Sequence, residues 1–161
     1  MPETSKHGSA TTTRRASASD PGIALVAALA ERDFGRLAET LAPDVRMRAL
    51  IPPGPIELTG AEAAVAKFST WFGGAEELEL VRSGSDEVSD RVHVFYRLRV
   101  KRPGDPWKIV EQHCFCALAR GRITALDLLC TGFRPDTAGA LPAPLGGSSR
   151  RTLSKREGMI A

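Results

Sequence analysis

The chain has 161 residues, 42% of them hydrophobic, and this length fits one domain of ordinary size. It contains no run of about 20 apolar residues that could cross a bilayer, and its three cysteines are too few for a disulfide framework. The formal net charge is +3, but residues 1–19 and 136–161 carry +2 each, so the stretch between them carries −1. That stretch lacks the basic face that nucleic-acid binding requires.

We expect one folded domain over residues 20–135, between disordered tails at 1–19 and 136–161. The first tail is rich in Ser, Thr and Ala, and the second consists mostly of Ala, Gly, Pro, Ser and Arg. Such segments bury too little apolar surface to offset the entropy of ordering them. The start of the chain lacks the apolar centre of a secretory signal. These features predict a cytoplasmic protein with no membrane contact and no nucleic-acid partner.

The first part of the domain predicts two helices and a strand. Asp20 is a typical N-cap, and the apolar residues after it recur at helical spacing. Asp33 begins a second, shorter helix in the same way. Residues 45–50 alternate as a strand does, and the prolines and glycine of residues 52–55 predict a rigid loop after it.

A third helix is predicted from Thr59-Gly60-Ala61-Glu62, which matches a capping box, to the pair Gly73-Gly74. Its aromatic residues Phe68, Trp71 and Phe72, together with Met47 of the preceding strand, favour core packing. In a hollow fold the same residues would also line a ligand cavity.

After Gly74 the hydrophobic period changes from 3.6 to 2, which predicts strands. The four expected strands cover residues 77–82, 91–100, 107–119 and 122–130. Their connections are short, so neighbouring strands should pair antiparallel. Helices followed by such a run of strands indicate an α+β fold.

The two tightest turns allow the pairing to be predicted. A two-residue turn at Arg120-Gly121 pairs Ala119 with Arg122, and a four-residue loop at 103–106 pairs Arg102 with Trp107. Since side chains alternate along a strand, each face then follows. The face expected to take the helices carries Val92, Val94, Tyr96, Leu98, Glu111, His113, Phe115, Leu126, Leu128 and Cys130.

The opposite face is expected to carry Phe95, Arg97, Arg99, Val110, Gln112, Cys114, Asp127 and Leu129. Arginines mixed with aromatic and aliphatic residues are typical of protein interfaces. This composition predicts a homodimer formed through the convex face of the sheet. A solvated sheet face with scattered apolar residues is the alternative.

The order of elements resembles the cone-shaped α+β fold of the nuclear-transport-factor-2-like superfamily, particularly its SnoaL-like branch. The likeness rests on Leu41-Ala42-Pro43-Asp44-Val45, on Thr59-Gly60-Ala61-Glu62-Ala63, and on the last hairpin with Leu126-Asp127-Leu128. It implies a curved antiparallel sheet with about three N-terminal helices on its concave face, around a pocket. It also implies a convex face that often forms a dimer.

The resemblance supports no single reaction of that superfamily. His113 falls where ketosteroid isomerase has the aspartic acid of its oxyanion hole, but Ala49 falls where that enzyme has its general base. The acid of the polyketide cyclases is replaced by Leu128. Tyr96 is the only tyrosine of the chain, so the isomerase's helix tyrosine has no counterpart.

Glu111, His113 and Tyr96 are the predicted catalytic residues. Glu111 and His113 lie two residues apart on one strand, so their side chains share a face. A carboxylate and an imidazole together in a pocket are typical of proton transfer near neutral pH, and Tyr96 could donate to an oxyanion or a ligand carbonyl. The alternative is a polar pair at the pocket mouth, or a ligand anchor without chemistry.

The cysteines do not predict a metal site. Cys114 and Cys116 lie on the opposite face of their strand from His113, whereas zinc ligands must converge. We therefore expect neither a metal nor a cofactor. The predicted ligand-binding residues are Met47, Phe68, Trp71, Phe72, Phe115, Leu128 and Cys130.

Two functions remain open from the sequence. The first is a pocket protein for a small apolar or polycyclic molecule, with isomerase, cyclase, dehydratase or hydrolase chemistry as a possible activity. The second is a non-catalytic binder or a dimeric interaction module.

Overall fold

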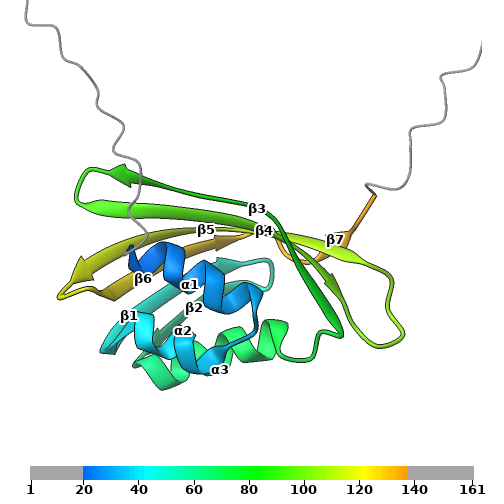
Figure 1. Ribbon diagram of the computed structural model, residues 1–161, viewed down its shortest axis with the longest axis horizontal. Helices are drawn as coiled ribbons and strands as arrows, with labels where there is room; N and C mark the ends of the chain where they lie inside the picture. Colours follow the sequence, from blue (N-terminus) through cyan, green and yellow to red (C-terminus); the bar gives the residue numbers. More distant parts are fainter. Residues whose placement is uncertain (1–19, 138–161) are drawn as a thin grey trace, which may run out of the picture.

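The computed structural model describes residues 20–137 as three helices and one curved seven-stranded sheet (Figure 1). The predicted N-terminal tail lies outside the described residues, as does the C-terminal tail apart from Asp136 and Thr137. No helix among the described residues is long and apolar enough to cross a membrane.

The first two helices begin at the predicted N-caps. Helix α1 (Pro21–Ala30) starts after Asp20, whose side chain accepts a hydrogen bond from the Gly22 amide at 2.7 Å. Helix α2 (Phe34–Thr40) starts after Asp33, which accepts from the Arg36 amide at 2.9 Å. Each carboxylate satisfies an amide that the first helical turn leaves unpaired.

The next segment contains a strand that the sequence analysis missed. Strand β1 (Leu41–Ile51) turns at Pro52-Pro53 into β2 (Gly54–Thr59), where a rigid loop was predicted. Proline is tolerated here because β2 is an edge strand of the sheet. Helix α3 (Ala61–Phe72) follows, but its N-cap is Gly60 at φ 97°, with no side-chain cap. The predicted capping box is therefore wrong, since Thr59 remains in the ladder opposite Arg46.

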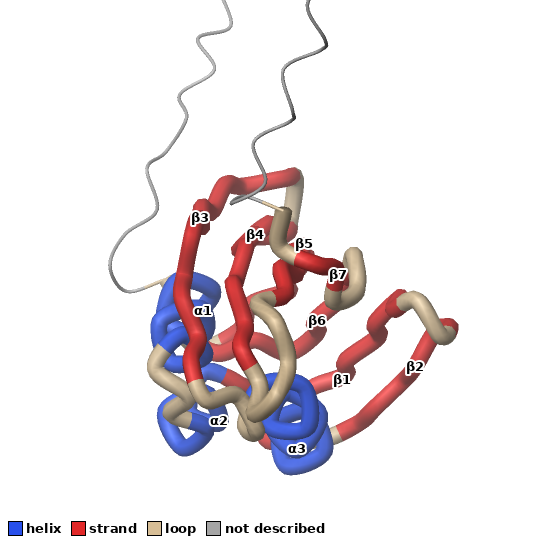
Figure 2. Tube along the Cα trace, turned by 90° about the vertical axis from the view of Figure 1, so that its right-hand side faces the viewer, coloured by secondary structure: helices blue, strands red, loops and turns tan. Residues whose placement is uncertain are grey.

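The remaining strands are β3 (Glu77–Val88), β4 (Arg91–Lys101), β5 (Lys108–Ala119), β6 (Arg122–Cys130) and the short β7 (Arg134–Pro135). The sheet order is β2-β1-β6-β5-β4-β3, with β7 paired to β5. Of the pairings between described strands, that of β1 with β6 is parallel and the others are antiparallel. The three helices lie together on the concave side of this sheet (Figure 2).

Both predicted registers of β5 are off by one residue along the strand. Between β4 and β5, Val100 pairs with Lys108. Arg102 lies outside this ladder, and its guanidinium donates to the Trp71 carbonyl of α3. Between β5 and β6, the predicted pair of Ala119 with Arg122 next to the turn is confirmed. Farther from the turn, a bulge between the Leu118 and Ala117 pairs shifts the remaining pairs by one residue. The two shifts add to two residues between β4 and β6, which keeps the predicted faces of those two strands, so β5 alone is turned over.

The inner face of the sheet, which the helices cover, therefore carries Gln112 and Cys114 instead of Glu111 and His113. Strands β4 and β6 present Tyr96, Leu98 and Leu128 there as predicted. The core on this face is closely packed. Its largest side chains without exposed surface include Met47, Phe68, Phe72, Tyr96 and Leu98.

The outer face carries the side chains that alternate with the core. It includes Glu111, His113 and Phe115 from β5, which corrects their predicted position under the helices, and Asp127 and Leu129 from β6. The residues of this outer face include Arg48, Leu50, Glu57, Arg82, Asp86, His93, Phe95, Arg97, Arg99, Glu111, His113, Phe115, Asp127 and Leu129.

Candidate functional site

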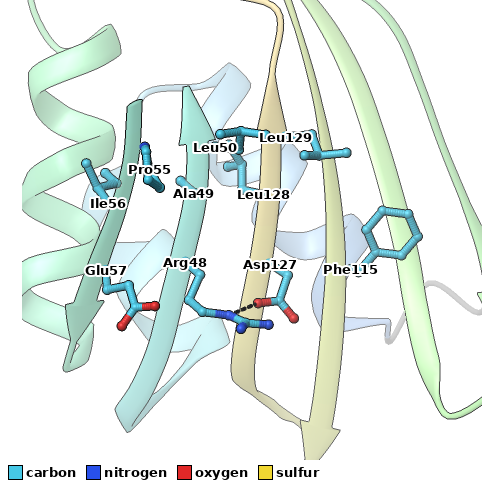
Figure 3. A pocket seen from close by; sticks show the side chains of 10 residues that line it. All are labelled: Arg48, Ala49, Leu50, Pro55, Ile56, Glu57, Phe115, Asp127, Leu128 and Leu129. Carbon is cyan, nitrogen blue, oxygen red and sulfur yellow. Dashed lines mark hydrogen bonds and ion pairs between the residues drawn. The ribbon is translucent and has the colours of Figure 1, made fainter. Parts of the chain in front are cut away.

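A groove on the outer face runs across four strands of the sheet. Strands β2, β1, β6 and β5 enclose about 400 Å³ of open space (Figure 3). Its lining includes Leu50, which is 55% exposed, and Leu129, which is 48% exposed, on adjacent strands. The remaining lining residues are Arg48, Ala49, Pro55, Ile56, Glu57, Phe115, Asp127 and Leu128.

A second hollow of about 280 Å³ adjoins the first, because both are lined by Leu50 and Leu129. It extends toward the β1–β2 turn and the end of β6, where His113, Cys130 and Thr131 lie. We call the two hollows together the outer groove. Four of the predicted site residues line it: Phe115, Leu128, His113 and Cys130.

An ion pair forms one end of the outer groove. Arg48 Nε donates to Asp127 Oδ1 at 2.6 Å (Figure 3). Arg91 approaches the other carboxylate oxygen of Asp127 at 3.5 Å. The hydrogen bond from Arg48 is the main reason that the pKa of Asp127 is lowered. The same bond raises the pKa of Arg48. Both groups are therefore charged at neutral pH, and each already has a partner.

The other end of the groove meets a chain of hydrogen-bonded side chains across three strands. His113 Nε2 lies 3.0 Å from Glu111 Oε1, and His113 Nδ1 lies 3.0 Å from His93 Nε2. The chain continues from His93 Nδ1 to Asp86 at 2.7 Å and from Glu111 to Arg97 at 2.6 Å. The pKa of Glu111 is lowered, first by His113 and then by Arg97. Both ring nitrogens of His113 are thus engaged within the protein.

Two aromatic rings border this chain. The His93 ring lies 4.8 Å from the Phe115 ring and 5.8 Å from the Phe95 ring, in nearly parallel planes. Arg82 places its guanidinium over Phe95 at 5.2 Å. The outer face therefore presents a flat aromatic and imidazole surface beside the apolar groove.

The inner face holds a separate polar chain, in which Tyr96 and Gln112 are buried and Cys130 is partly exposed. Tyr96 donates to Gln112 Oε1, and Gln112 Nε2 donates to Cys130 Sγ at 3.3 Å. Burial raises the pKa of Tyr96 and of Cys114 well above their usual ranges, and raises that of Cys116 to about 12. These groups remain neutral at physiological pH, so they offer hydrogen bonds and no charge.

The structure brings together only some of the predicted site residues. Glu111 and His113 lie side by side on the outer face, whereas Tyr96 lies on the inner face. Met47, Phe68 and Phe72 have no exposed surface and belong to the core, and Trp71 packs edge-on against Phe68 at 5.5 Å. Among residues 20–137, no three His, Cys, Asp or Glu side chains converge as metal ligands do.

Several contributors to the outer face were missed from the sequence. From the sequence, Arg97 was expected on a face that forms a dimer interface, Arg48 was expected to face solvent, and His93 was not singled out. Their partners lie 14, 79 and 20 residues away along the chain, respectively. The signal that could have found His93 is its alternation with Val92 and Val94, which places it beside Phe95.

Three helices on the concave face of a curved, mainly antiparallel sheet define the nuclear-transport-factor-2-like fold class. Within it, the chain belongs to the SnoaL-like domain family, which matches residues 23–126. No curated protein matches the sequence.

Solved structures show the same fold at low sequence identity. One is a Catenulispora acidiphila protein with a ketosteroid isomerase-like fold, solved in complex with trimethylamine. It is 16% identical to this chain, with a TM-score of 0.55, and the match covers 68% of this chain and 83% of that protein. A candidate SnoaL-like polyketide cyclase from a Jannaschia species is 19% identical with a TM-score of 0.55, covering 73% and 91%. A candidate polyketide cyclase from Pseudomonas putida is 15% identical with a TM-score of 0.55, covering 70% and 90%.

Proposed function

We propose that this protein binds a small, largely apolar molecule in the outer groove. The observation that carries the proposal is the pair of half-exposed leucines, Leu50 and Leu129, in a hollow of about 400 Å³ in which Arg48 and Asp127 are ion-paired with each other. Ligand sites are typically apolar hollows of about 300–1,000 Å³ with a few polar groups that fix orientation. The Arg48–Asp127 pair at one end and His113 at the other are groups of that kind.

Binding without catalysis is favoured over acid–base chemistry at this site. A general base must have a nitrogen or oxygen within hydrogen-bond reach of the substrate. His113 has both ring nitrogens engaged, and Glu111 is held by His113 and Arg97. The catalytic role predicted for Glu111, His113 and Tyr96 would require these bonds to break, and Tyr96 to act from the opposite face. It therefore stays a prediction.

A fluorescence titration with 8-anilinonaphthalene-1-sulfonate, a probe of apolar surface, tests the proposal. Leu129→Asp places a charge in the middle of the groove and should weaken probe binding about tenfold or more. Leu118→Asp is the matched control, because Leu118 is also exposed on the sheet but does not line the groove. Equal loss in both variants, or no loss in Leu129→Asp, contradicts the proposal.

A homodimer through the outer face is the second candidate, and it has a specific observation in its favour. Leu50 and Leu129 lie beside aromatic rings and arginines, a combination enriched at interfaces. The two candidates compete for one surface, so light scattering distinguishes them. A dimer that Leu129→Asp converts to monomer, with unchanged probe binding, favours the interaction module.

A further inference from the structure

Two imidazoles meet nitrogen to nitrogen on the outer face. His93 on β4 and His113 on β5 are the only histidines among residues 20–137. His93 Nε2 and His113 Nδ1 lie 3.0 Å apart, whereas the ring centroids lie 5.2 Å apart with planes only 9° from parallel. The nearest approach is therefore between the two nitrogens at the ring edges, as in an N–H···N hydrogen bond.

The other nitrogen of each ring faces a carboxylate. His93 Nδ1 lies 2.7 Å from Asp86 Oδ1, and His113 Nε2 lies 3.0 Å from Glu111 Oε1. An ionised carboxylate only accepts hydrogen bonds. The lowered pKa of Glu111 keeps it ionised, so the hydrogen of this bond belongs to His113. The same geometry assigns a hydrogen on His93 Nδ1 to Asp86.

Two neutral imidazole rings carry too few N–H hydrogens to donate all three hydrogen bonds of this chain. A neutral imidazole carries one N–H, so the pair has two, but the three bonds along the chain need three. If both hydrogens point outward to the carboxylates, two lone pairs face each other at 3.0 Å. We propose that His93 and His113 share one additional bound proton, which makes the pair an imidazole–imidazolium couple with a single positive charge.

The surroundings favour this charge. Asp86 on β3 and Glu111 on β5 lie at the two ends, and Arg97 on β4 neutralises only one of them. The side chain of His93 is only 16% exposed, and an imidazolium against an aromatic ring is favourable. Other charged groups on this face include Arg82, which lies over Phe95, and Arg91, two residues from His93 on β4, which approaches Asp127.

The shared proton would link three strands through their side chains. Asp86, His93 and His113 stand on β3, β4 and β5, and His113 also lines the outer groove. Above about pH 6.5 the imidazoles of the unfolded chain are mostly neutral, so the native couple binds one more proton than the unfolded chain. The stability that the couple contributes is therefore lost as pH rises above this value and the proton leaves. The inference does not depend on a ligand in the groove.

Ring nitrogen NMR of the full chain tests the proton count. His7→Gln removes the third histidine and leaves two imidazoles, and EDTA excludes trace metal. At about pH 7.5, where an unperturbed imidazole is mostly neutral, we expect three ring N–H protons, one coupled to nitrogens of both rings. Two N–H protons, or four without coupling between rings, would overturn the proposal.

Thermal unfolding supplies a second, independent readout. In His93→Gln the amide can donate to His113 Nδ1 and to Asp86, so the contacts survive without the additional proton. The Tm of the His7→Gln protein should exceed that of the His7→Gln/His93→Gln protein at about pH 6, and the difference should shrink by a few degrees toward about pH 9. A difference that does not change with pH indicates a merely structural histidine and contradicts the shared proton.

Discussion

Replacing Tyr96 by Phe tests the closed polar chain of the inner face. The hydroxyl of Tyr96 donates to Gln112 Oε1, and Gln112 is only 1% exposed, so water cannot take its place. The Phe ring keeps the apolar contacts and opens no large cavity. The cost is therefore that of one buried acceptor left unpaired, about 1–3 kcal/mol, which corresponds to several degrees in Tm for a domain of this size.

Urea unfolding of four proteins measures this cost: wild type, Tyr96→Phe, Gln112→Leu and the double variant. Replacing both partners by apolar groups of similar size is nearly neutral. The double variant should therefore be more stable than either single variant and close to wild type, with a coupling energy of about 0.5–3 kcal/mol. A Tyr96→Phe protein within about 0.5 kcal/mol of wild type would refute the reasoning.

Three further predictions concern other parts of the fold. Gly22→Ala should lower the free energy of unfolding by about 1–3 kcal/mol through overpacking, because the added Cβ would lie 2.3 Å from Val94 Cγ2. Gly74→Ala is the control, since an added Cβ there has nothing within 4 Å, and it should be neutral in the same urea assay. Equal effects of the two substitutions would contradict this account of the packing. Iodoacetamide should alkylate one cysteine of the native protein, Cys130, because Cys114 and Cys116 are at most 1% exposed and the pKa of each thiol is raised. Mass spectrometry counts the added groups, and two groups on the native protein would contradict this prediction. The lowered pKa of Asp127 gives stability that is lost as pH falls, so Arg48→Met should flatten the decline of Tm between about pH 5 and about pH 3; an unchanged decline contradicts the role of this pair.

Local signals in the sequence were sufficient for the helices and for most strands. Asp20 and Asp33 cap helices because an N-cap needs only the next few residues. The change of period after Gly74 located β3 to β6, although β3 continues to Val88, beyond the predicted end. Strand β2 was missed because proline signals a loop, and only its edge position in the sheet makes Pro55 acceptable.

The face of β5 could not be predicted, because two tertiary details determine it. Arg102 leaves the β4–β5 ladder to reach the Trp71 carbonyl, and the bulge near Thr124 adds a residue between β5 and β6. Each shifts the register by one residue, which exchanges the two faces of a strand. The predicted closeness of Glu111 and His113 is confirmed, since it depends only on alternation, but their predicted position beneath the helices is wrong.

The most direct measurement is methyl NMR of the full chain during titration with the naphthalene probe. A molecule in the outer groove shifts the methyl signals of Leu50 and Leu129 in a saturable manner, and leaves those of Leu25 and Leu37 in the core unchanged. Shifts confined to Ile23, Val26 and Leu80, which line a separate cleft between α1 and β3, would place the binding site elsewhere and contradict the proposed function.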